Sequence, residues 1–204
     1  MNIDSNVAPE ELGLYSFLDG MKQKVHLVQR DHRWKSANKL LWTYMEHKDS
    51  TILCFDDGKD YPLDCIEELL DAHHKSLDCI VAEESNPVRI DIDGHAFYEN
   101  SLELPFGQKC FSKYLSNACL FPPRCFGDGS LLTDYNKFYE MTSATHDELW
   151  FWLVSTLCKV RSVRLDSTMS YMLDEKTIYK LDDVSLSYIN CSHDRVKEYN
   201  TKVD

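Results

Sequence analysis

Residues 51–62 read Thr51-Ile52-Leu53-Cys54-Phe55-Asp56-Asp57-Gly58-Lys59-Asp60-Tyr61-Pro62. The apolar run predicts a buried strand, which ends abruptly in two adjacent carboxylates, a glycine and a Tyr-Pro stop. Open α/β sheets bind ligands at the carboxyl ends of their strands, which is where Asp56 and Asp57 would lie. Two hard oxygen ligands at that edge can hold a divalent cation against substrate phosphates. The stretch therefore predicts an enzyme, and the alternative is a solvated acidic turn.

Helices and strands alternate on both sides of this stretch. Apolar periodicity predicts helices at 9–21, 36–47 and 63–74, the second with Ser36 as its N-cap, and short apolar runs predict strands at 24–29, 51–55 and 78–82. This order is typical of an α/β protein with a mostly parallel central sheet flanked by helices. Later segments predict a hairpin over 88–95, a strand at 115–121, helices at 134–141 and 147–160, and a strand at 161–165.

Composition limits the classes of function. The net charge of −12 argues against general nucleic-acid binding, which needs clustered Lys and Arg. The sequence has no apolar run of the length that a membrane-spanning helix needs, and no signal peptide at its start, so we expect no transmembrane segment. The eight cysteines are scattered without CxxC spacing, which favours reduced thiols in a cytoplasmic protein.

A second pair of acids precedes the aromatic helix. In Thr145-His146-Asp147-Glu148, Thr145 can be the N-cap and Glu148 its capping-box partner, which is a structural role. A carboxylate at a helix N-terminus is equally a rigid mount for a general base. Lys39 also has two interpretations. It either lies on a solvated helix face or binds a diphosphate.

The combined segments resemble bacterial glycosyltransferases of the GT-A type, similar to family two, with an Asp-Asp-Asp motif. The resemblance covers approximately residues 24–175 and is carried by an ordered set of motifs, which are Asp31 through Lys39, Ile52-Leu53-Cys54-Phe55-Asp56-Asp57 with Tyr61-Pro62, Asp78-Cys79-Ile80-Val81-Ala82, Leu120-Phe121-Pro122-Pro123, and Thr145-His146-Asp147-Glu148-Leu149-Trp150-Phe151-Trp152.

The resemblance implies transfer of a sugar from a nucleotide-diphospho-sugar donor to a glycan or other hydroxyl acceptor in cell-surface polysaccharide synthesis. Asp31, Lys39 and Asp56 would then bind the nucleotide sugar, and Asp56 with Asp57 would bind Mg²⁺ or Mn²⁺. Asp147 or Glu148 would deprotonate the acceptor. Peripheral contact with a membrane is compatible with this function.

Two departures from the family keep an alternative open. Gly58 stands where the third acid of the motif would fall, and the first strand unit of the family has no clear counterpart before residue 24. The alternative is therefore a catalytically impaired glycosyltransferase-like remnant or binding module. A hydrolase that pairs Asp57 with Asp147 is a third possibility.

We expect a single GT-A-like domain over residues 1–204. Its parts are an atypical N-terminal helical segment (1–23), a nucleotide- and metal-binding half (24–85), an acceptor-side half (86–175) and a polar C-terminal tail (176–204).

Overall fold

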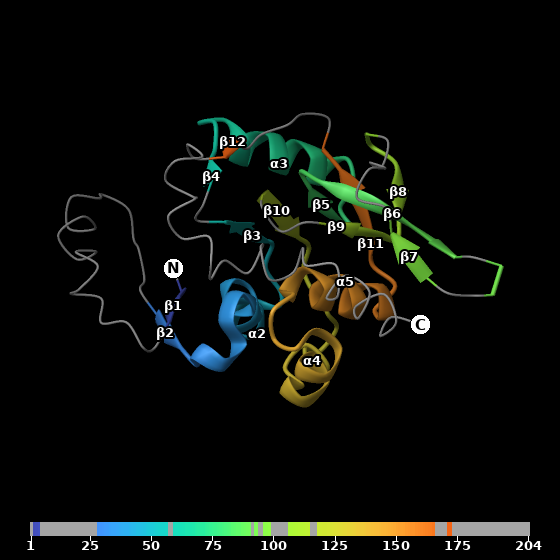
Figure 1. The fold of residues 1–204 in the computed structure, drawn as a ribbon. Coiled ribbons are helices and arrows are strands. Elements are labelled where there is room, and N and C mark those ends of the chain that lie inside the picture. The colour runs from blue at the N-terminus through green and yellow to red at the C-terminus, as the bar shows by residue number, and fades with distance from the viewer. Residues whose placement is uncertain are drawn as a thin grey trace, which may run out of the picture.

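A five-stranded sheet lies at the centre of the computed structural model (Figure 1). The structure describes residues 2–4, 28–56, 59–90, 92–93, 96–98, 106–114, 118–165 and 171–172. From one edge to the other, the strands of the sheet are β3 (Ile52–Phe55), β10 (Ala118–Phe121), β5 (Cys79–Ala82), β11 (Arg161–Arg164) and β8 (Lys109–Cys110).

The sheet is mixed, so the expectation of a mostly parallel sheet is wrong. Strands β5 and β11 are parallel neighbours, but β10 is antiparallel to both β3 and β5, and β8 is antiparallel to β11. Strands β3 and β5 do run in the same direction, as their connection through a helix predicts, yet β10 separates them. All four residues of β10 are buried, which is typical of a strand in the middle of a covered sheet.

Helices cover both faces of the sheet (Figure 1), which confirms the α/β class. Helix α3 (Cys65–His74) packs on one face against β5 and β10. The opposite face is covered by α2 (Leu41–His47) and α5 (Asp147–Leu157), and α4 (Tyr135–Thr142) packs against α5. No helix in the described part of the chain is long and apolar enough to cross a membrane.

Smaller sheets accompany the central one. The predicted hairpin is confirmed, because β6 (Ser85–Ile90) pairs antiparallel with β7 (Ala96–Tyr98), and β6 also pairs with β9 (Ser112–Tyr114). The other pairs are β1 (Asn2–Asp4) with β2 (Val28–Arg30), and β4 (Lys59–Asp60) with β12 (Tyr171–Met172). The helix expected at 9–21 and the tail 176–204 lie outside the described residues.

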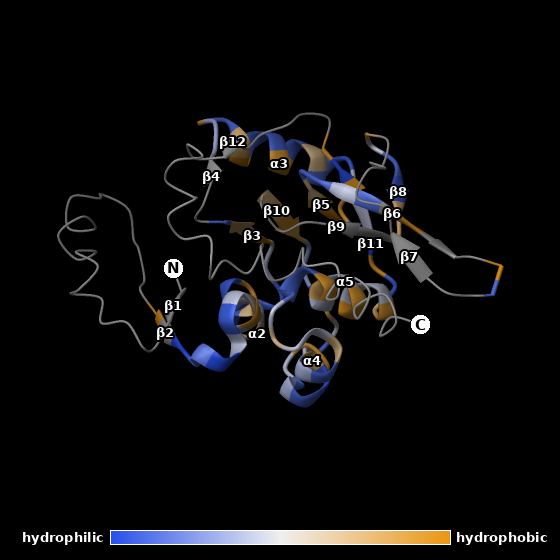
Figure 2. Ribbon diagram, viewed as in Figure 1, coloured by the Kyte–Doolittle hydropathy of each residue, from blue (hydrophilic) through white to orange (hydrophobic). Residues whose placement is uncertain are grey.

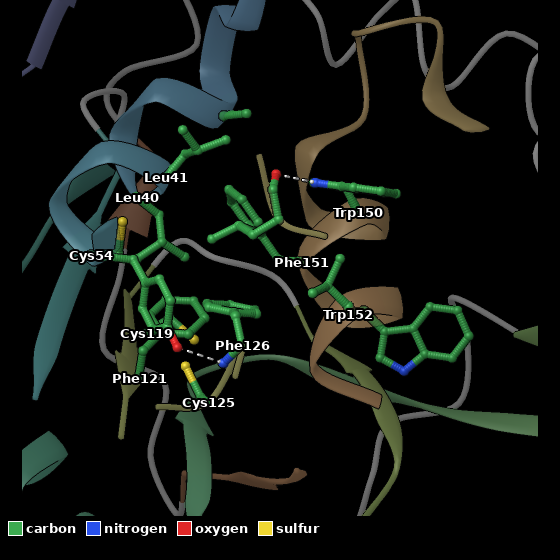
Figure 3. Packing of buried hydrophobic residues seen from close by; sticks show 14 of the residues in the cluster. Leu40, Leu41, Cys54, Cys119, Phe121, Cys125, Phe126, Trp150, Phe151 and Trp152 are labelled. Atoms are coloured by element: carbon green, nitrogen blue, oxygen red, sulfur yellow. Dashed lines mark hydrogen bonds between the residues drawn. The ribbon is translucent and has the colours of Figure 1, made fainter. Parts of the chain in front are cut away.

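Two apolar clusters hold the layers together, one on each face of the sheet. Figure 2 shows the hydrophobic residues gathered on the strands and on α5. In the larger cluster, Phe151 of α5 lies against Phe121 and Phe126, and the Trp150 indole donates a hydrogen bond to the carbonyl oxygen of Leu132 at 3.0 Å (Figure 3). Burying side chains of this size contributes about 1.5–3 kcal/mol each.

The single helix expected over 36–47 is replaced by two elements. A 3-10 helix, η1 (His32–Lys39), begins four residues earlier, and its N-cap is Asp31, whose side chain accepts a hydrogen bond from the Arg33 N–H. Ser36 is therefore not the cap. The backbone of Lys35 (φ 45°, ψ −127°) interrupts η1, and Leu40 separates η1 from α2.

Candidate functional site

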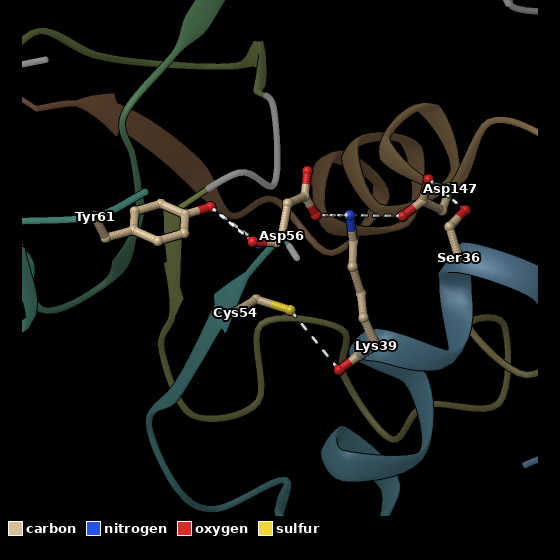
Figure 4. A network of polar contacts seen from close by, with 6 residues as sticks. All are labelled: Ser36, Lys39, Cys54, Asp56, Tyr61 and Asp147. Atoms are coloured by element: carbon tan, nitrogen blue, oxygen red, sulfur yellow. Dashed lines mark hydrogen bonds and ion pairs between the residues drawn. The ribbon is translucent and has the colours of Figure 1, made fainter. Parts of the chain in front are cut away.

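Lys39 lies between two carboxylates that are far apart in the sequence (Figure 4). Its Nζ is 2.9 Å from Asp56 Oδ1 and 3.0 Å from Asp147 Oδ2. The side chains are partly sheltered, with exposed fractions of 20% for Lys39, 30% for Asp56 and 10% for Asp147. The structure thus brings together three of the residues predicted as site residues.

The end of β3 and a tyrosine hold Asp56 in place. The Tyr61 hydroxyl accepts a hydrogen bond from the Asp56 N–H at 3.0 Å and is 3.3 Å from the Asp56 carbonyl oxygen, to which it can donate. The Tyr61 ring packs edge-on against Phe55, with 5.0 Å between ring centroids. Tyr61 thus contacts the backbone of Asp56 on both its N–H and its carbonyl oxygen, whereas Asp57 and Gly58 lie outside the described residues.

Asp147 is the first residue of α5, and both of its carboxylate oxygens are engaged. Ser36 Oγ donates to Oδ1 at 2.9 Å, and Oδ2 is buried and forms the ion pair with Lys39. The predicted Thr145 cap is wrong, because the N-cap of α5 is His146, which makes no side-chain cap bond. Thr145 Oγ1 donates instead to the carbonyl oxygen of Thr142.

Burial and charge act in opposite directions on the central pair. Burial on its own lowers the pKa of Lys39, but the charges of Asp147 and Asp56 outweigh it and raise that pKa well above its usual value. Burial tends to raise the pKa of Asp147, but the Lys39 charge and the Ser36 hydrogen bond bring it below its usual value. At neutral pH, Lys39 is therefore a cation and Asp147 an anion.

Cys54 lies beside the network formed by Ser36, Lys39, Asp56, Tyr61 and Asp147, and it is a structural thiol. Its Sγ lies 3.7 Å from the carbonyl oxygen of Lys39, and burial raises its pKa to about 12. A thiol with this pKa stays protonated at neutral pH and does not act as a nucleophile. All the cysteines in the described residues are free.

The other predicted site residues have different positions. Asp31 lies at the opposite end of η1 from Lys39 and forms an ion pair with Arg33 at 2.6 Å. Glu148 follows Asp147 on α5, and its charge adds to the effect of Asp147 and Asp56 on the pKa of Lys39. Asp57 lies outside the described residues.

One carboxylate oxygen of Asp56 lies outside the ion pair with Lys39. Figure 4 shows that the second carboxylate oxygen of Asp56 is directed away from Lys39. Magnesium commonly binds one or two carboxylates together with substrate phosphates and water. Asp56 would be one such carboxylate ligand. Among the described residues, no group of three or more His, Cys, Asp or Glu side chains is arranged to hold a metal ion.

Two residues of the network were not predicted as site residues. The sequence predicts Ser36 as a helix N-cap and Tyr61 as part of the Tyr-Pro pair that follows the acidic residues. In the structure, Ser36 contacts Asp147 and Tyr61 contacts Asp56. The sequence carries no local signal for the Ser36 contact, which joins two residues 111 positions apart.

In comparisons with known proteins, no family model and no curated protein sequence matches this chain.

Proposed function

We propose that the chain is a glycosyltransferase that moves a sugar from a nucleotide-diphospho-sugar to a hydroxyl acceptor such as a glycan. The observation that carries the proposal is the placement of Lys39 between Asp56 and Asp147. Asp56 follows strand β3, a position that suits a ligand of the donor. Asp147 begins helix α5, a position that suits a general base. Their convergence on one cation supports a single site, and the resemblance in sequence motifs supports the choice of reaction.

On the donor side, Lys39 and Asp56 have complementary tasks. The Lys39 ammonium, one-fifth exposed, is able to turn from the carboxylates toward the diphosphate of the donor. Asp56, with Asp57 beside it in sequence, would hold Mg²⁺ or Mn²⁺. The bound metal would neutralise the charge that develops on the departing nucleoside diphosphate.

On the acceptor side, Asp147 is the proposed base. The acceptor hydroxyl transfers its proton to Oδ2 while its oxygen bonds to the anomeric carbon of the donor. The bond from that carbon to the phosphate oxygen breaks, and the nucleoside diphosphate leaves with the electron pair. Because Oδ2 is buried against Lys39 here, Lys39 must move before the proton is transferred. Donor binding, which attracts Lys39, would therefore come before acceptor attack.

The experiment is a turnover assay of the full chain on a panel of nucleotide sugars, with and without Mn²⁺, that measures released nucleoside diphosphate. We expect release from one donor, and a loss of about 10²–10⁴-fold in Asp147→Asn, the range that general-base catalysis contributes. Glu148→Gln, which removes the neighbouring charge, tests which acid is the base. Release that is unchanged in both variants would overturn the assignment.

A binding module is the second candidate, and the buried ion pair favours it. Lys39 forms ion pairs with both carboxylates, an arrangement that a domain without turnover can retain. This candidate predicts that a nucleotide binds while no donor in the panel releases nucleoside diphosphate.

A further inference from the structure

Ser36 makes the second contact between η1 and Asp147. Its hydroxyl donates to Oδ1 at 2.9 Å, while Lys39 Nζ lies 3.0 Å from Oδ2. We propose that Ser36 is a positioning residue, which holds the Asp147 carboxylate so that Oδ2 alone is presented to Lys39 and to the acceptor. This proposal rests on the proposed role of Asp147 as the base, and it deepens that role by assigning the reacting atom.

Other contacts hold η1 in place without Ser36. The Trp34 ring stacks on Phe138 of α4, with 5.2 Å between centroids and 19° between planes. Asn38 Nδ2 donates to the carbonyl oxygen of Asp31 at 2.8 Å, and Asn38 Oδ1 accepts from the Trp42 indole at 2.9 Å. The Ser36 hydroxyl is therefore not required to anchor its own segment, and its effect falls on Asp147.

The backbone beside Ser36 is strained in a way that serves this contact. Lys35 has a positive φ of 45°, which is unfavourable for a residue with a side chain, and that side chain is exposed. The interruption at Lys35 lets Trp34 pack against α4 while Ser36, two residues later, reaches α5. Backbone strain of this kind clusters at functional sites.

The Asp147 carboxylate is held from η1, because its contacts with Ser36 and Lys39 both come from that segment. Asp147 lies just after the N-cap residue of α5, where its Oδ1 accepts a hydrogen bond from Ser36 and its Oδ2 pairs with Lys39. Rotation about the bond to the carboxyl carbon exchanges Oδ1 with Oδ2. The hydrogen bond from Ser36 opposes that rotation and orients the plane of the carboxylate, and small displacements of a reacting group reduce rates strongly.

The test uses the full chain labelled with 13C at the aspartate carboxyl carbons, observed by NMR at neutral pH. Asp147→Asn identifies the Asp147 resonance. We expect Ser36→Ala to shift or broaden it, Ser36→Cys to do the same because a thiol is a weak donor, and Ser36→Thr to restore it. Thermal midpoints should fall by about 2–4 °C in the alanine variant, the range for a loss of one such bond in a chain of this size.

Ser130→Ala is the matched control. Ser130 Oγ also donates to an aspartate, Asp128 Oδ1 at 2.7 Å, but on an exposed turn. This substitution should leave the Asp147 resonance unchanged. An Asp147 resonance that is the same in Ser36→Ala as in the native chain, or equally altered in the alanine and threonine variants, would overturn the proposal.

Turnover separates this proposal from the proposed function. With an identified donor, kcat should fall about tenfold in Ser36→Ala and recover in Ser36→Thr, while KM for the donor stays constant. If the resonance responds as expected but no donor is turned over, Ser36 still positions Asp147 and the glycosyltransferase assignment fails. A donor that is turned over equally well by Ser36→Ala would refute the positioning role alone.

Discussion

Lys39 carries the charge balance of the site, because its ammonium faces Asp56 on one side and Asp147 on the other. Removing one partner of a buried pair leaves the other charge without compensation. We expect Lys39→Met to lower the free energy of unfolding by about 2 kcal/mol, less than for a fully buried pair because Lys39 keeps some exposure. Urea denaturation measures the change.

The matched control for this substitution is Lys137→Met. Lys137 Nζ lies 3.6 Å from Asp134 Oδ2 in an exposed i,i+3 pair, and its side chain is 60% exposed. Exposed pairs contribute about 0–1 kcal/mol, so the control should change little. Equal effects of the two substitutions would show that Lys39 is not balancing buried charge.

The depressed pKa of Asp147 predicts how stability depends on pH. A carboxyl group with a lowered pKa in the folded state stabilises it above the unfolded pKa, about 3.9, and loses that contribution as pH falls through the folded value. The stability difference between the native chain and Asp147→Asn should therefore be constant from about pH 6 to 8 and shrink below about pH 4. Thermal midpoints measured across this range test it, and a difference that grows on acidification would contradict it.

Three of the residues predicted as site residues lie together in the structure, but the contact from Ser36 to Asp147 was not predicted. Residue type and position indicated Lys39, Asp56 and Asp147, because strand ends and helix starts are places where charged groups serve ligands. The Ser36 contact spans 111 positions in the chain and depends on how η1 meets α5, which no local pattern encodes.

At the scale of the elements, η1 contains the most testable strain. The positive φ at Lys35 costs a non-glycine residue about 1–3 kcal/mol, whereas glycine adopts it freely at an entropic cost of about 0.5–1 kcal/mol. Lys35→Gly should therefore raise the free energy of unfolding by about 1 kcal/mol. Chemical denaturation at pH 7 provides the measurement.

Lys75→Gly is the control for Lys35→Gly, because it places glycine at an unstrained position. Lys75 is the C-cap of α3 with an ordinary φ of −81°, so glycine there removes no strain and should destabilise the chain slightly. If glycine destabilises the chain at position 35 as much as at position 75, the strain at Lys35 is not real.

The sheet shows why element types were easier to predict than their partners. Apolar runs predicted four of the five central strands within a few residues, but not β8, and the shared direction of β3 and β5 follows from the helix that connects them. The insertion of β10 between them depends on long-range packing, since Cys119 of β10 pairs with both Cys54 and Ala82. Alternation of helices and strands favours a parallel sheet, but it does not reveal a strand that returns from later in the chain.

At the scale of the whole molecule, the two apolar clusters lie on opposite faces of one sheet and should unfold together. Phe151 is fully buried on the α5 face, and Leu69 is fully buried on the α3 face. Phe151→Ala should cost about 3–5 kcal/mol and Leu69→Ala about 2–5 kcal/mol. Both variants should keep a single unfolding transition in urea, followed by fluorescence and by circular dichroism.

Leu77→Ala is the surface comparison, because Leu77 is 64% exposed, and its effect should stay within about 0.5 kcal/mol. Two separate transitions in either core variant would mean that the layers fold independently. The site would then join two bodies, with Asp56 on the sheet and Asp147 on the helical layer.

The most direct test of the proposed glycosyltransferase site is calorimetric titration of one nucleotide sugar in the presence of Mn²⁺, with the donor chosen from the turnover panel. The native chain and Asp147→Asn should bind it with similar affinity, because Asp147 serves the acceptor, whereas Asp56→Asn should bind it at least tenfold more weakly, a loss of about 1.4 kcal/mol or more. Undiminished binding by Asp56→Asn, or no binding of any nucleotide by the folded native chain, would contradict the assignment.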